Sequence, residues 1–110
     1  MNIDHQIISR AVTTATRPNT KTFVKKIICF ETPSSTEINF LRRKKIFNPN
    51  FFFDIGSEIN KKIKLLKIYK GEIKTSPSLR SLQGIRILAK YRGSQIGVKY
   101  AEAFELIRVL

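Results

Sequence analysis

The chemistry that this sequence could perform centres on its one histidine. His5 follows Asp4 directly, and Asn2 stands three positions before it. A neutral imidazole is a common metal ligand, and a neighbouring carboxylate can orient such a ligand by hydrogen bonding. A lone histidine is more often structural or simply exposed. Zinc needs at least three protein ligands, so His5 alone cannot make a zinc site.

The remaining reactive groups are few. Cys29 is the only cysteine and lies in the apolar run 27–30, so we expect a buried, inert thiol. No run of eighteen apolar residues exists, and residues 1–10 carry Asp4 and no long apolar stretch, so neither a membrane span nor a signal peptide is expected. These features together predict a cytoplasmic protein.

The charge is strongly positive. Twenty-one Lys and Arg against eight Asp and Glu give a net charge of +13. Such a chain can bind nucleic acid or anionic membranes, but solvated lysine faces, an AT-rich genome or a missing acidic half would explain the charge equally well. The basic run 42–45 could meet an anionic substrate group or form a solvated loop. An RNA-binding surface would need exposed aromatic residues among the basic ones. Phe23, Phe30 and Phe104 fall within apolar runs instead, which favours the core.

The first half of the chain predicts a helix and two strands. Apolar residues at helical spacing predict a helix over residues 3–16, with Asn2 or Asp4 as its cap. Residues 23–30 read as a strand. Its second half is continuously apolar, as is typical of a strand covered on both faces of a parallel sheet. Residues 51–55 form a further short strand or extended segment.

The second half predicts two helices and a final apolar segment. A helix is expected over residues 58–70, which Ser57 can cap. One apolar stripe follows its spacing: Ile59, Ile63, Leu66 and Ile73. A second helix is expected over residues 79–92, with Gly93 as its stop. Residues 101–110 could be strand or helix. The 110 residues and a hydrophobic fraction of 42% fit one small α/β domain that begins on a helix, as if a βα unit had lost its first strand.

Short segments along the whole chain resemble the C-terminal half of LmbE/PIG-L deacetylases, particularly those of the N-acetylglucosaminyl type. Asn2-Ile3-Asp4-His5 resembles the family's H-x-D-H element, with Asn2 in place of its first histidine. The other matching pieces follow in order: Ala15-Thr16-Arg17-Pro18, the stretch 30–37, Phe47-Asn48-Pro49-Asn50 with Phe53-Asp54-Ile55, Arg80-Ser81, Leu88-Ala89, Arg92-Gly93, Gly97 and Tyr100-Ala101-Glu102-Ala103-Phe104.

The resemblance implies a Rossmann-like parallel-sheet sandwich, of which residues 1–110 would be the C-terminal portion without its N-terminal βα units. It also implies a zinc-dependent hydrolase that removes the N-acetyl group from an N-acetylglucosamine-type amino-sugar derivative. By the same resemblance His5 is a metal ligand and Asp4 orients a histidine. Asn2 takes the place of the histidine that stabilises the oxyanion or protonates the leaving amine.

Two departures limit what this chain could do alone. The family's A-H-P-D-D-E motif is absent, and with it two of three metal ligands and the general base. Asn2 can donate a hydrogen bond but cannot give up a proton at neutral pH. Met1 stands directly before the H-x-D-H-like segment, which we interpret as a truncated or internal start. We therefore expect zinc only in a complete protein, a partner in the missing N-terminal half, and an inactive chain alone.

Other interpretations stay open. The chain could be a small basic nucleic-acid-binding protein, with at most weak, non-specific binding expected, or the non-functional remnant of a broken gene. The identity of the amino sugar and the oligomeric state are also open. Arg92 and Glu102 are polar members of the closing segments, and a structural ion pair or loop anchor is the expected role for both.

Overall fold

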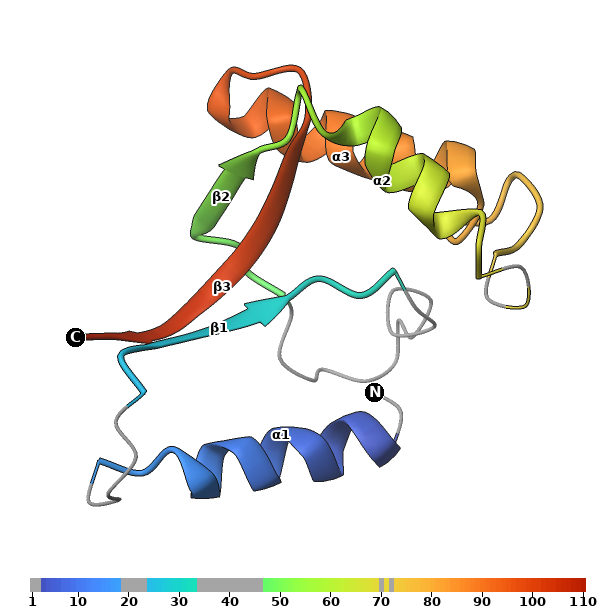
Figure 1. Cartoon of the computed structure of the whole chain (residues 1–110). Helices are drawn as coiled ribbons and strands as arrows, with labels where there is room; N and C mark the ends of the chain where they lie inside the picture. The colour runs from blue at the N-terminus through green and yellow to red at the C-terminus, as the bar shows by residue number, and fades with distance from the viewer. Residues whose placement is uncertain (1–2, 19–23, 34–46, 70, 72) are drawn as a thin grey trace.

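A computed structural model describes residues 3–18, 24–33, 47–69, 71 and 73–110. The described elements follow in the order α1 (Ile3–Ala15), β1 (Lys26–Phe30), β2 (Phe51–Asp54), α2 (Ile59–Leu66), α3 (Leu82–Ile96) and β3 (Ala101–Val109) (Figure 1). These residues form an α/β fold, as the sequence predicts. Asn2, the basic run 42–45 and Phe23 lie outside the described residues.

The sheet has three strands in the order β1-β3-β2. The last strand of the sequence is the central one, and both neighbours are antiparallel to it. Phe30 and Phe51 both lie opposite Phe104, on the two sides of β3. The register of β1 shifts by one residue between Ile27 and Ile28, so this part of the sheet contains a bulge.

The prediction of a parallel sheet is therefore wrong for the described strands. The apolar run 27–30 suggested a strand covered on both faces, but β1 is an edge strand in the described sheet, and both Cys29 and Phe30 are exposed. Exposure also overturns the buried thiol and the core position expected for Phe30, whose exposed fraction is 68%. A continuous apolar run is compatible with a strand covered on both faces, but it does not show that other parts of the same chain cover it.

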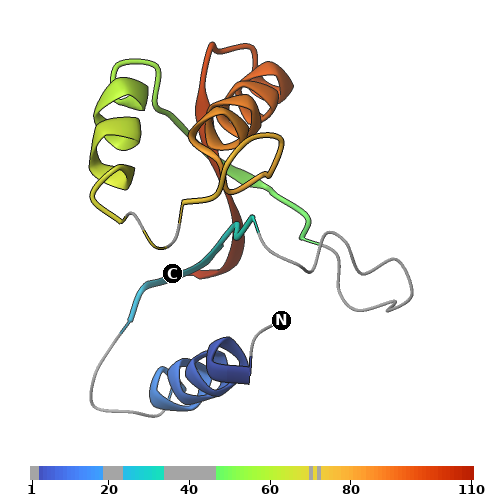
Figure 2. The same cartoon turned by 90° about the vertical axis from the view of Figure 1, so that its right-hand side faces the viewer.

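The core lies where α2 and α3 meet the first half of β3. Its buried apolar residues come from these three elements: Ile59, Ile63, Ala89, Ala101 and Ala103. The two helices pack against each other, and α3 also packs against β3. Figure 2 shows both helices above the sheet, with α1 alone on the opposite side. Their amphipathic spacing was visible in the sequence, although α2 ends four residues before the expected bound.

Two glycines decide how α3 ends. Gly93 was expected to stop the helix, but it lies inside α3 and is buried. A Cβ there would lie 2.6 Å from the Val98 carbonyl oxygen, so Gly93 lets the following turn approach the helix. The stop is Gly97, whose φ of 78° is left-handed. The start of α3 is also capped, since the Ser81 hydroxyl accepts a hydrogen bond from the Gly84 amide at 2.9 Å.

Helix α1 differs from the others because none of its 13 residues is buried. Its end is tied to the sheet through Arg108, which donates hydrogen bonds to the carbonyl oxygens of Thr16 and Val24 at 3.0 and 2.9 Å. No helix among the described residues is long and apolar enough to cross a membrane.

Candidate functional site

His5 and Asp4 both lie in the first turn of α1, and both are exposed. Asn2, the third residue of the predicted constellation, lies outside the described residues. The structure therefore places the predicted metal ligand and its carboxylate neighbour on one helix, as their spacing requires. All three predicted site residues lie within positions 2–5, so no other described element brings a predicted site residue to His5.

The described residues do not by themselves fit a zinc ion. Across residues 3–18, 24–33, 47–69, 71 and 73–110, no three His, Cys, Asp or Glu side chains are grouped so that they could hold a metal. A catalytic zinc takes three protein ligands. His5 supplies one donor of the right chemistry, and the remaining donors would have to come from elsewhere.

Arg92 forms the most buried ion pair described. Its guanidinium donates two hydrogen bonds to the carboxylate of Glu31, from Nε at 3.0 Å and from Nη2 at 2.5 Å. The two side chains are 12% and 9% exposed. Arg92 lies on α3 and Glu31 directly follows β1, so the pair fixes the end of β1 to the helix layer. The ion pair expected for Arg92 is confirmed, and its two parallel hydrogen bonds hold the carboxylate in one orientation.

A second arginine holds the same segment. Arg80 precedes α3 and donates from Nε to the carbonyl oxygen of Pro33 at 3.0 Å. Residues 31–33, which directly follow β1, are therefore bonded at two points to residues far away in sequence. The sequence singled out Arg92 but named no partner for it. Only the position of Glu31 at the end of an expected strand could have suggested that partner.

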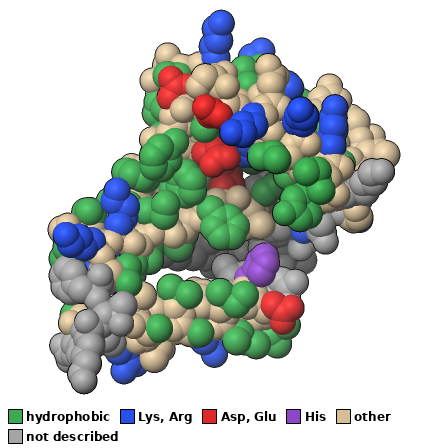
Figure 3. Space-filling view, in the orientation of Figure 1, with side chains coloured by type: hydrophobic (Ala, Val, Ile, Leu, Met, Phe, Trp, Pro, Cys, Tyr) green, Lys and Arg blue, Asp and Glu red, His purple; other side chains and the backbone are tan. Residues whose placement is uncertain are grey.

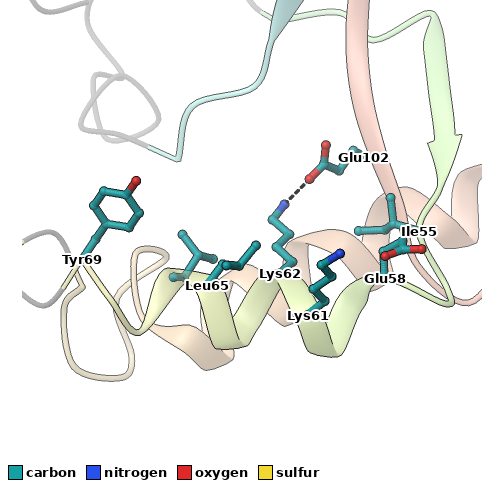
Figure 4. A pocket seen from close by; sticks show the side chains of 8 residues that line it. Ile55, Glu58, Lys61, Lys62, Leu65, Tyr69 and Glu102 are labelled. Carbon is teal, nitrogen blue, oxygen red and sulfur yellow. Dashed lines mark hydrogen bonds and ion pairs between the residues drawn. The ribbon is translucent and has the colours of Figure 1, made fainter.

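Glu102 pairs with Lys62 of α2 at 2.6 Å, and the two side chains are 37% and 33% exposed. This half-exposed pair is at the border of a cavity of about 360 Å³ beside α2 (Figure 4). The other lining residues come mainly from α2 and the turns at its ends: Ile55, Glu58, Lys61, Leu65, Leu66 and Tyr69. Glu102 thus joins β3 to α2, and its partner already occupies its carboxylate.

The family-like segments meet around a second cavity, also of about 360 Å³. Its lining takes residues from four of those segments and from the two packed helices: Phe30, Glu31, Pro33, Lys62, Leu66, Ile85, Leu88, Ala89, Arg92, Ala101, Glu102, Ala103 and Phe104. Asn50, from a fifth segment, accepts a hydrogen bond from the Leu106 amide at 2.6 Å. Pieces that are scattered along the sequence therefore contact one another in space.

One cluster was missed by sequence reasoning. Phe51, Phe53 and Phe104 make edge-to-face contacts with centroid distances of 5.2 and 5.6 Å. Phe30 lies opposite Phe104 in the register and shares its face. Phe53 is 49% exposed, so this aromatic face is only partly covered by the described residues. The run Phe51-Phe52-Phe53 predicted a strand, but it did not show which face of that strand would remain exposed.

Comparison of the chain with models of known protein families, with curated proteins and with solved structures finds no match. The family resemblance therefore depends on the short sequence segments alone.

Proposed function

We propose that these 110 residues are part of an N-deacetylase domain of the LmbE/PIG-L type. In this proposal the complete domain removes the N-acetyl group from an N-acetylglucosamine-type amino-sugar derivative in the cytoplasm. The chain contributes one metal ligand, His5, and is inactive alone. The strands described are antiparallel, so they do not supply the parallel Rossmann-like sheet that the resemblance implies.

The observation that carries the proposal is the convergence of the family-like segments. Glu31 from the Phe-Glu-Thr-Pro segment pairs with Arg92 of the Arg-Gly segment, and the pair is largely buried. Arg80 of the Arg-Ser segment bonds the carbonyl oxygen of Pro33 from the first of these. Residues chosen from sequence for their likeness to one family therefore hold one another in place.

The roles of the predicted site residues follow from their positions and chemistry. His5 is exposed on α1, so its imidazole can reach a metal that other residues also bind. Asp4 is adjacent and can orient a histidine by accepting a hydrogen bond. Asn2 can donate a hydrogen bond to a developing oxyanion but cannot act as a general acid. The base and the other ligands lie outside this chain.

The test joins this chain to the N-terminal portion of an LmbE/PIG-L deacetylase that carries A-H-P-D-D-E. We expect this joined protein to hold stoichiometric zinc after dialysis and to release amine from an N-acetylglucosamine derivative. The chain alone serves as the control and should do neither. Stoichiometric zinc with turnover in the chain alone would refute the division of the site between two parts.

A second candidate is non-specific nucleic-acid binding. It is favoured by the net charge of +13 together with exposed aromatic side chains: Phe30 at 68%, Tyr69 at 63% and Tyr91 at 55%. The exposure of Phe30 removes one argument against this function, which was its expected place in the core. Stacking and phosphate neutralisation would supply the affinity.

Fluorescence anisotropy with labelled single-stranded RNA and DNA of several sequences tests this candidate. We expect weak binding without sequence preference, which falls steeply between about 50 and 200 mM salt because released counterions drive it. Sequence-selective binding that survives about 200 mM salt would favour the nucleic-acid function over the deacetylase.

A further inference from the structure

One face of α1 carries an exposed apolar stripe. Four branched aliphatic residues recur at helical spacing, with exposed fractions of 69% for Ile3, 59% for Ile7, 60% for Ile8 and 45% for Val12. No residue of α1 is buried. A 13-residue helix gains most of its stability from packing an apolar face, so this stripe requires a cover.

A strand edge lies beside this stripe. β1 is an edge strand of the described sheet, and α1 lies beyond β1 on the side away from α2 and α3 (Figures 1 and 2). An edge strand presents backbone N–H and C=O groups that can pair with a further strand. Figure 3 shows a hollow between α1 and the rest of the molecule, bordered on both sides by hydrophobic side chains. An extended segment added to β1 would enter this hollow and lie against α1.

We propose that the outer edge of β1 and the apolar stripe of α1 together bind an extended segment of an acidic polypeptide. The segment adds a strand next to β1 and packs its apolar side chains on Ile3, Ile7, Ile8 and Val12. This proposal rests on the proposed function, under which the polypeptide is the N-terminal part of the same domain.

Charge complementarity identifies the partner as acidic. The chain carries +13, and the exposed Lys25 directly precedes β1, whereas the Lys26 ammonium lies over the Phe51 ring of β2. Lysines on an edge strand oppose pairing with another cationic chain. A second copy, also at +13, is therefore disfavoured, whereas an acidic segment gains attraction at the same positions. A bilayer surface could cover the stripe of α1, but it offers no strand to pair with the edge of β1.

The experiment selects peptides from a random 16-residue library displayed on phage against the whole chain. The Ile7→Ser/Ile8→Ser variant is used for counter-selection. We expect the selected peptides to contain more Asp and Glu than Lys and Arg. The best peptide, synthesised and labelled, should bind more weakly as salt rises from about 0.01 to 0.1 M. Hydrogen exchange should show new protection of the amides of β1 in the complex.

Two substitutions distinguish a contribution of the α1 stripe from that of any exposed apolar side chain. Ile8→Ser should weaken the peptide about tenfold, because burial of such a side chain is worth over 1 kcal/mol. Ile68→Ser is the matched control, since Ile68 is 71% exposed after α2 and should leave the affinity unchanged. Circular dichroism checks that both variants keep the helix content of the parent.

Several results would overturn the proposal. These are a library that yields no binder, selected peptides without an acidic excess, equal loss with Ile68→Ser, and a bound state without protection in β1. A dimer of the chain that Ile8→Ser dissociates in sedimentation would make a second copy the occupant. Binding to phosphatidylglycerol vesicles with the same Ile8 dependence would make it a membrane. None of these results depends on zinc or turnover, so failure here is distinct from failure of the deacetylase proposal.

Discussion

The two ends of this molecule are built in opposite ways. The packed region consists of α2, α3 and the first half of β3, and it holds all five buried apolar residues described. The open region consists of α1 and β1, where α1 buries nothing and β1 exposes Cys29 and Phe30. His5 lies in the open region. Stability within this chain therefore comes from one region, and the candidate chemistry belongs to the other, for which we propose a partner.

Arg92 and Glu31 connect the two regions, so their separation should have the largest effect on folding. Arg92→Ala leaves a carboxylate that is 9% exposed without its guanidinium. Loss of one partner of a buried pair costs about 3 kcal/mol or more. We expect the urea midpoint to fall strongly, or the chain to unfold altogether. Lys90→Ala, exposed on the same helix, should change little. Equal effects of the two variants would mean that the ion pair does not hold β1 to the helices.

A methyl group at Gly93 should have the next largest effect, and it tests the close packing of the packed region. The added Cβ would lie 2.6 Å from the Val98 carbonyl oxygen, which is backbone and cannot rotate away. Such overpacking costs about 1–3 kcal/mol, more than the helix propensity of Ala returns. We expect Gly93→Ala to lower the free energy of unfolding, measured by urea titration. A variant as stable as the parent would show that this turn is loose.

Substitution in the open region should have the smallest effect on the isolated chain. Ile8 is 60% exposed, so Ile8→Ser removes almost no buried area, and a change within about 0.5 kcal/mol is expected. Ile63→Ser, at a position 8% exposed, is the contrasting variant and should destabilise the chain by several times more. If Ile8→Ser destabilised the chain as much as Ile63→Ser, α1 would already be packed and the comparison between the regions would fail.

The sequence predicted local structure well and long-range arrangement poorly. The helix of α1 and the short strand β2 follow from spacing and from the Phe51-Phe52-Phe53 run, because both signals are local. Ser57 was expected to cap α2, but Glu58 takes that position and makes no side-chain cap. Gly93 and Gly97 could not be ranked as helix stops, since the choice depends on where the chain returns after α3.

Strand direction and burial depended on distant residues. The run 27–30 looks the same whether its neighbours are parallel or antiparallel, and the pairing with β3 comes from residues more than 70 positions later. The roles of His5, Asp4 and Asn2 came from the family resemblance and stay predictions. Arg92 was named correctly as an ion-pair residue, whereas its partner Glu31 became visible only in the fold.

The most direct test of the central claim is zinc content and deacetylation rate, measured on the same samples of the joined protein and its variants. His5→Ala should lose both, because two ligands are too few to hold a catalytic zinc. Asn2→Ala should keep zinc and lose about 100- to 1000-fold in rate at most, as for one oxyanion donor. Asp4→Asn should fall between them. If His5→Ala retains both its zinc and its rate, His5 is not a metal ligand and the proposed function is wrong at its most important residue.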